Sequence, residues 1–399
     1  MKRQTRLVTG AAALAGLSLL MTGCAGGGGT ADAAGDTDTA HGSSDARIAV
    51  SYEGGIAVID AETLEVVEQF DSEQFTRLNA FGDGRHVAVT TSKGFQVLDT
   101  ATPELTDLVF DATAAGHVVR HAGKTVLFDD GTGTTTIVDT EGLLQSDGSL
   151  PETQTYTAES AHHGVSIVLD DGTLVTTVGT EESRTGAVAL HPHDDHWHEA
   201  ASSDECPGIH GEGTAADEAV IFGCENGALL FHDGEFTKFT APDDYGRMGN
   251  AYVSETSAIV VGDYKSDPDA EGYLLNAMTL IDTAAGTYDV VDLPDEVQYT
   301  FRDVVRGPDD NAYILSSDGS IHVLDPTSGE LVDAFPVIDP WEGPSEWQDA
   351  HPAIVTDGEV GYVTEPSANA LHVVDLATGE VLTTAEFEFT PNEVAVAQS

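Results

Sequence analysis

Histidines are concentrated in one short stretch of this chain, and imidazole is the side chain that most often binds transition-metal ions in proteins. Four of them alternate with carboxylates in a single run, and they are His191, His193, His196 and His198. Such a run binds a borderline divalent ion weakly and exchangeably, because nothing within it holds the ligands in place. The alternative interpretation is a solvated polar loop that binds no metal.

Other histidines stand at regular intervals, and a repeat explains their spacing. Two apolar residues, an Asp, a polar turn and an apolar strand recur about every 40–50 residues. The clear copies contain Asp60, Asp99, Asp139, Asp282, Asp325 and Asp375. One gap is about three times as long as the others, and weaker copies near 190 and 233 fill it. Units of this length, built from short strands and turns, predict an all-β propeller with eight blades, or seven if the two weak copies form one blade.

The two ends of the repeat region complete each other. The first unit begins at Ile48 and lacks an innermost strand, while the residues from Glu393 to Ala397 form a strand without a partner. Pairing these two segments would close the ring and cover the open edges. We therefore expect one propeller domain over residues 47–399, closed by its terminal strands.

Each blade of a propeller starts with a strand that lines the central channel, and we call the residue at this start the rim position. Aligned repeats assign it to Arg77, His117, His163, His210, Arg247, Arg302 and His351. Imidazoles that converge from several blades would suit tetrahedral Zn²⁺. His162 is a further candidate ligand, and Asp349 and Glu212 would complete the shell or orient an imidazole. The strand and turn histidines are expected to be structural, namely His86, His121, His322 and His372.

The N-terminus resembles an export signal. Lys2, Arg3 and Arg6 precede an apolar run, and small residues lead to Cys24 in the manner of a lipobox. The run is shorter than the roughly 20 residues that span a bilayer, which disfavours a transmembrane helix. We expect a signal peptide over 1–23, lipidation of Cys24 and a flexible tether over 24–46. The protein would then be exported and anchored by lipid to the outer face of the cytoplasmic membrane.

The net charge limits the classes of partner, and the cysteines suggest a disulfide. The chain has 69 acidic and 15 basic residues and a formal charge of −54, which excludes nucleic acid and charge-driven docking on anionic lipid. We expect a monomer that touches the membrane only through its anchor. Cys206 and Cys224 fall at the same end of one predicted hairpin, so a disulfide is expected, with a thiolate metal site as the alternative.

Three segments resemble AztD, a family of exported zinc metallochaperones that serve a zinc ABC transporter. They are His162-His163-Gly164-Val165, the histidine run, and Cys206-Pro207-Gly208-Ile209-His210-Gly211-Glu212 together with Cys224. The resemblance implies a propeller that holds Zn²⁺ and passes it to the transporter's solute-binding protein, and it implies no enzyme. His117 and His351 come from the repeat register and not from these segments. The lipobox and the acidic surface depart from the family pattern and suggest a tethered protein.

Two other functions are compatible with the residues. A metal-dependent propeller hydrolase, such as a lactonase, would need an open metal position and a general base, a role that Asp349 or Glu212 would fill. A metal-free interaction propeller is the other alternative, because a fold alone does not fix function. Ligand type does not separate zinc from copper or nickel.

Overall fold

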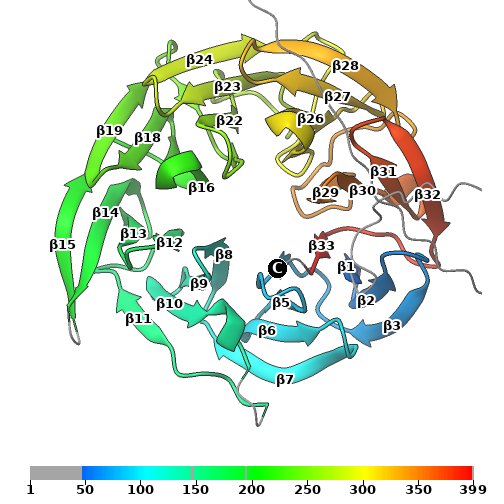
Figure 1. The fold of residues 1–399 in the computed structure, drawn as a ribbon, viewed down its shortest axis with the longest axis horizontal. Coiled ribbons are helices and arrows are strands. Elements are labelled where there is room, and N and C mark those ends of the chain that lie inside the picture. Colours follow the sequence, from blue (N-terminus) through cyan, green and yellow to red (C-terminus); the bar gives the residue numbers. More distant parts are fainter. Residues whose placement is uncertain (1–46, 145–147, 194–195, 398–399) are drawn as a thin grey trace, which may run out of the picture. The chain divides into compact units, whose positions relative to one another are not determined.

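A computed structural model describes residues 47–144, 148–193 and 196–397, which form eight antiparallel sheets around a common axis (Figure 1). The predicted all-β propeller with eight blades is confirmed, because the weak copies near 190 and 233 belong to separate sheets. The proposed signal peptide, Cys24 and the tether lie outside the described residues. Within these ranges no helix is long and apolar enough to cross a membrane. The helical segments there are short 3-10 turns, η1 (Thr140–Gly142), η2 (Ala216–Glu218), η3 (Pro308–Asp310) and η4 (Pro366–Ala368).

Blades 1 to 4 follow one another along the chain, and each begins with its innermost strand except blade 1. Blade 1 contains β1 (Arg47–Tyr52), β2 (Gly55–Asp60) and β3 (Val66–Asp71), and blade 2 contains β4 (Leu78–Ala80), β5 (His86–Thr91), β6 (Gly94–Asp99) and β7 (Glu104–Asp111). Blade 3 contains β8 (Ala115–His121), β9 (Lys124–Asp129), β10 (Thr134–Asp139) and β11 (Gln154–Thr157). Blade 4 contains β12 (Ser166–Val168), β13 (Leu174–Gly179), β14 (Arg184–His193) and β15 (His196–Ser203).

Blades 5 to 8 repeat this order. Blade 5 contains β16 (His210–Ala215), β17 (Ala219–Cys224), β18 (Asn226–His232) and β19 (Glu235–Thr240), with β20 (Gly246–Arg247) beside β18. Blade 6 contains β21 (Ala251–Tyr252), β22 (Ile259–Asp263), β23 (Ala277–Asp282) and β24 (Thr287–Asp292). Blade 7 contains β25 (Val304–Arg306), β26 (Ala312–Leu315), β27 (Ser320–Asp325) and β28 (Glu330–Pro336), and blade 8 contains β29 (Ala353–Asp357), β30 (Val360–Glu365), β31 (Ala370–Asp375) and β32 (Glu380–Glu386).

The last strand closes the ring as predicted. β33 (Val394–Val396) pairs antiparallel with β1, with Ile48 opposite Val396 and Val50 opposite Val394 (Figure 1). Blade 1 thus obtains its innermost strand from the other end of the described chain. Because this pairing covers both otherwise open strand edges, the first and last repeats are held together by backbone hydrogen bonds.

The repeated Asp is a turn residue. Asp60 ends the third strand of its sheet, and its Oδ1 accepts hydrogen bonds from the backbone N–H of Glu62 (3.1 Å) and Thr63 (2.9 Å). Asp282 does the same for Ala284 (3.0 Å) and Ala285 (2.8 Å) in blade 6. A carboxylate that binds the N–H groups of the following turn fixes the point at which the chain reverses. The sequence theme therefore marks the turn from the third to the outermost strand.

Apolar side chains fill the spaces between neighbouring sheets. The largest cluster joins blades 3, 4 and 5 through buried residues that include Val119, Ile167 and Phe222. Cys206 and Cys224 lie in the same cluster and form the predicted disulfide. Burial of this apolar area fixes how the three blades stand relative to one another, and the candidate site is built on these three blades.

Candidate metal centre

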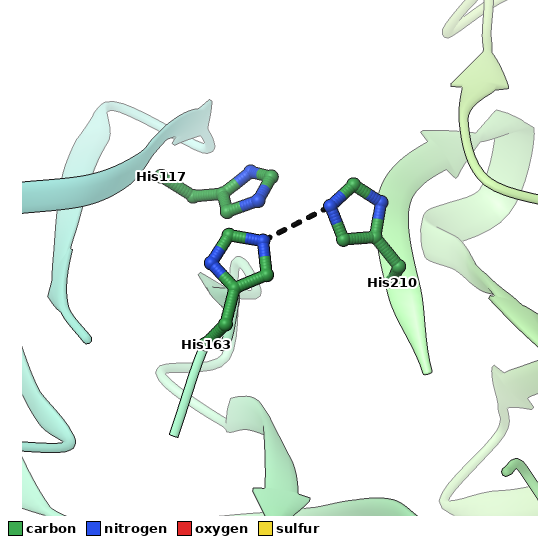
Figure 2. A group of neighbouring side chains, drawn as sticks. All are labelled: His117, His163 and His210. Atoms are coloured by element: carbon green, nitrogen blue, oxygen red, sulfur yellow. Dashed lines mark hydrogen bonds between the residues drawn. The ribbon is translucent and has the colours of Figure 1, made fainter. Parts of the chain in front are cut away.

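Three histidines from blades 3, 4 and 5 converge on one point (Figure 2). His117 lies in β8, His163 precedes β12, and His210 begins β16. Their ring centroids are 5.1–5.2 Å apart, and one nitrogen of each lies within 4.8 Å of the others. We call these residues the triad. Among the residues that the structure describes, it is the one group of three or more His, Cys, Asp or Glu side chains close enough to share an ion.

Breaks in strand register set the directions in which the rings of His117 and His210 point. The pairing of β8 with β9 shifts register around His117, and that of β16 with β17 shifts directly after His210. The extra residue in the second bulge is Gly211, whose φ is +56°. A Cβ at this position would lie 2.2 Å from the carbonyl oxygen of Gly249, so only glycine fits. Bulges are a common means of re-aiming a side chain next to a functional site.

Hydrogen bonds fix the tautomers of His163 and His210. His163 Nδ1 donates to Asp130 Oδ2 at 2.6 Å, and His210 Nδ1 donates to the carbonyl oxygen of Gly249 at 2.6 Å. Both partners are acceptors, so the proton must reside on Nδ1 in each ring. The Nε2 atom of each neutral ring then carries a lone pair. Metal-binding histidines in proteins are held by the same kind of outer hydrogen bond.

The two Nε2 atoms face each other at 3.0 Å (Figure 2). With both lone pairs in place, this contact is repulsive unless a proton or a cation lies between the rings. Two imidazoles bound to a tetrahedral Zn²⁺ have their nitrogens about 3.3 Å apart, since each Zn–N bond is about 2.0–2.1 Å. His163 and His210 therefore need only small shifts to become two ligands of one zinc ion, and His117, with a nitrogen within 4.8 Å of both, would supply the third.

The electrostatic surroundings keep two of these imidazoles neutral. Loss of hydration within the ring of blades lowers the pKa of His210 to about 3, against an opposing effect of its hydrogen bond to Gly249. The pKa of His117 is lowered well below its usual value, first by loss of hydration and then by the charges of the other two histidines and of Arg77 and Arg184. A neutral imidazole is the metal-binding form, so these two rings need not release a proton to bind an ion.

His162 does not join the triad, contrary to the sequence-based expectation. Only 2% of it is exposed, and its Nδ1 donates to the carbonyl oxygen of Ser160 at 2.9 Å. Its Nε2 lies 3.0 Å from Thr177 Oγ1. Both ring nitrogens are thus used within blade 4, because successive residues of an extended chain point in opposite directions.

His351 and Asp349 are also placed elsewhere. His351 is buried, and its Nε2 accepts a hydrogen bond from Arg302 Nε at 3.0 Å. Its Nδ1 donates to the carbonyl oxygen of Asp349 at 2.7 Å, while the Asp349 carboxylate is exposed and accepts from the backbone N–H of Glu346 at 2.9 Å. Loss of hydration, and after it the neighbouring guanidinium, lowers the pKa of His351 to about 4. At this rim position the imidazole of His351 therefore binds the guanidinium of Arg302 and is not available to a metal ion.

Glu212 is separated from the triad by the bulge. It pairs with Phe222 in β17, and loss of hydration raises the pKa of its carboxyl to about 7. No carboxylate oxygen of Glu212 belongs to the group around the three histidines. The carboxylate that supports the triad is Asp130, which is not among the site residues predicted from the sequence. Its position, one residue after the second strand of blade 3, is the feature that would have revealed it.

The remaining strand and turn histidines have carboxylate partners, as expected for structural residues. The pairs are His86 with Asp83 (2.5 Å), His121 with Glu218 (3.0 Å), His322 with Asp318 (2.9 Å) and His372 with Glu365 (2.9 Å).

The histidine run forms the outer hairpin of blade 4. Across β14 and β15, His191 is opposite His198 and His193 is opposite His196; the rings of the second pair are 4.9 Å apart. His191 Nδ1 lies 3.1 Å from Thr173 Oγ1, beside the turn that follows β12. That turn is six residues beyond His163, which at about 3.3 Å per residue places the run about 20 Å from the triad.

Comparison with solved structures supports the fold. Two structures of AztD from Citrobacter koseri match with TM-scores of 0.72 and 0.68, at 20% and 19% identity, each covering 88% of this chain and 96% of the other. The chain has the fold of AztD. The dihydro-heme d1 dehydrogenase NirN matches at a TM-score of 0.58 and 11% identity, over 89% of this chain and 76% of that one. No family model matches the sequence. The predicted likeness to AztD is confirmed, and at these identities it establishes the propeller alone.

Proposed function

We propose that this protein is a zinc chaperone, which holds one Zn²⁺ at the triad and delivers it to the solute-binding protein of a zinc ABC transporter. The observation that carries the proposal is the contact of His163 Nε2 with His210 Nε2 at 3.0 Å. Both rings have their proton held on Nδ1 by an acceptor. This arrangement is unfavourable alone and favourable around a cation. The shared fold with AztD and the resemblance of the histidine segments support the choice of cargo.

Delivery requires that the ion can leave, and the triad suits this. Three imidazoles leave one position of a tetrahedral zinc open to an incoming ligand. His163 is the most accessible of the three, with 44% of its side chain exposed, whereas His117 and His210 are half-buried. An acceptor ligand can therefore enter beside His163 and displace the protein ligands in turn.

The histidine run has a separate role in this proposal. Its exposed rings form a two-stranded site that exchanges ions with solvent, which raises the local concentration of zinc. Because it is about 20 Å from the triad along the strands, side-chain motion alone cannot pass an ion between them. Capture at the run and storage at the triad are thus two binding events with different affinities.

The location follows from the N-terminal pattern. We infer export, lipidation at Cys24 and retention on the outer face of the cytoplasmic membrane by a tether over 24–46. The excess of carboxylates would attract divalent cations to this surface. A disulfide between Cys206 and Cys224 is consistent with an oxidising compartment.

The proposal is tested by zinc stoichiometry and transfer. Purified protein should bind about one zinc tightly, and the double variant His163→Ala/His210→Ala should lose this site. His232→Ala is the matched control, because His232 lies in blade 5 on β18, away from the axis. Zinc should then move to a purified transporter solute-binding protein faster than it moves to a chelator in solution. Unchanged stoichiometry in the double variant would reject the triad as the storage site.

A hydrolase shares the requirement for an open metal position, and the same preparation distinguishes it. A catalytic site needs a general base near the bound water. Neither nearby carboxylate is placed for this role, because Asp130 is hydrogen-bonded to His163 and Glu212 lies beyond the bulge. Turnover of lactones or esters that depends on zinc at the triad would favour catalysis over delivery.

A further inference from the structure

Arginines surround the triad, although the chain has few basic residues, with 15 Lys and Arg against 69 Asp and Glu. Arg77 directly precedes the first strand of blade 2, on one side of the three histidine blades, and Arg247 ends β20 of blade 5, shortly before the first strand of blade 6, on the other side. Arg184 begins β14 in blade 4, the middle histidine blade. We call Arg77, Arg184 and Arg247 the flanking arginines. A site made only to attract Zn²⁺ would place carboxylates here, because guanidinium groups repel the ion.

The flanking arginines are close enough to act on the ligands. Arg184 is joined to the His210 segment through the backbone, because the N–H of Gly208, two residues before His210, donates to the carbonyl oxygen of Arg184 at 2.9 Å. Arg247 Nη2 lies 3.6 Å from the position a Cβ would take on Gly249, the residue whose carbonyl oxygen binds His210. Arg184 and Arg247 thus lie beside the segments that carry and orient His210.

Nearby carboxylates do not use up the donors of these arginines. Glu393 accepts from Arg77 Nε at 3.1 Å and from Arg302 Nη1 at 2.9 Å, so one negative charge is shared by two guanidinium groups. Arg184 Nη1 is buried and has no hydrogen-bond partner among the described residues. A buried donor without a partner is costly, and an anion bound beside Arg184 would satisfy it.

We propose that the triad binds zinc together with a small carboxylate-type anion, which takes the position left open by the three imidazoles and is anchored by Arg184. This inference rests on zinc binding at the triad. A planar guanidinium matches the two oxygens of a carboxylate or bicarbonate, and the anion offsets the charges of both the metal and the arginines. The anion must leave, or be replaced by a ligand of the acceptor, before zinc can be passed on.

Cobalt substitution tests the proposal, because the visible bands of Co²⁺ respond to a change in its ligands. The purified protein is loaded with Co²⁺ and titrated with acetate or bicarbonate at constant ionic strength, with perchlorate as the non-coordinating control. We expect a saturable change with acetate and bicarbonate and none with perchlorate. Arg184→Gln should raise the half-saturating concentration about 10- to 100-fold, as expected for loss of a hydrogen bond to a charged group. Arg184→Lys should give an intermediate value, because it keeps the charge and loses the paired donors.

Control variants separate the possible failures. Arg85→Gln should behave as the wild type, since Arg85 pairs with Asp99 at the end of the third strand of blade 2. If Arg184→Gln does not fold, Arg77→Gln decides, and it should raise the half-saturating concentration severalfold. The anion proposal would be overturned, with the zinc site left intact, by either of two results. The Co²⁺ bands would not change with acetate or bicarbonate, or the titrations would be identical in the wild type and the arginine variants. Failure of the wild type to bind Co²⁺ would instead overturn the metal site itself.

Discussion

Acidification should weaken zinc binding at the triad far less than it would weaken binding at a site of three histidines with ordinary pKa values. An unperturbed imidazole has a pKa of about 6.5, so at pH 5.0 only about 3% of it is neutral and it loses about 30-fold in metal affinity. Three such ligands together would lose on the order of 10⁴-fold between pH 7.5 and pH 5.0. His210, with its pKa lowered to about 3, and His117, lowered well below its usual value, stay neutral over this range.

The expected loss is therefore that of protonating one ligand and not three, far below the fall on the order of 10⁴-fold for three ordinary imidazoles. Competition with a chromophoric chelator, corrected for the chelator's own protonation, gives the zinc affinity at each pH. Calorimetry in buffers of different ionisation enthalpy gives the number of protons displaced, which should not exceed one per zinc at pH 5.5. Circular dichroism over the same range checks that the propeller remains folded. A fall of a thousandfold or more, with two or three protons displaced, would refute the conclusion that the site holds its imidazoles neutral.

Three further outcomes follow from residues outside the triad. His351→Ala should leave zinc stoichiometry unchanged but lower the free energy of unfolding by about 2 kcal/mol, because a buried Arg302 donor loses its acceptor; chemical denaturation with a zinc assay measures both. Glu212→Gln should stabilise the fold by about 2 kcal/mol at pH 8 and not at pH 4. The pKa of Glu212 is about 7 in the folded protein, so its ionisation opposes folding only above the pKa of the unfolded chain, about 4.3. Equal shifts of the melting temperature at both pH values would contradict this. Replacing Cys206 and Cys224 by Ser should cost about 3 kcal/mol, the value for a loop of this length, and a loss under 1 kcal/mol in denaturant titrations would show that the bridge adds little.

The repeat predicted the fold well because its most regular residue, the Asp at the turn, acts only on its immediate neighbours in the chain. A carboxylate that binds the next N–H groups, as Asp60 does, needs only its own turn, so the same residue recurs wherever that turn is made. Blades 4 and 5 have weaker copies of the repeat, which the spacing and the apolar residues near 190 and 233 indicate. Ring closure was predictable because each end lacked a partner that the other could supply.

The site was predicted in part, and the errors have physical causes. Repeat register places a Cα near the axis, and it identified His117, His163 and His210 as neighbours. It also placed Arg302 at the position before His351, but it could not show that the guanidinium donates to the imidazole and so takes the nitrogen that a metal would need. It also does not give the direction of a ring, which separates His162 from the residue that follows it.

The supporting groups were harder to find than the ligands. Asp130 and the carbonyl oxygen of Gly249 fix the tautomers, yet each belongs to a different blade from the ring that it binds. The bulge at Gly211 changes which side chains share a face, and no periodic pattern predicts a single extra residue. Such contacts depend on how neighbouring sheets pack, which spacing along one chain does not specify.

The rim positions also bear on how such a site changes over evolutionary time. The rim residues come from different blades, and an arginine stands next to the histidine blades on both sides. Histidine in place of Arg77 or Arg247 would put a further imidazole at the edge of the three histidine blades. The scaffold need not change, because the strands that present these residues are held by their own turns and cores. Ligand number, and with it the retention time of the ion, is therefore open to selection one blade at a time.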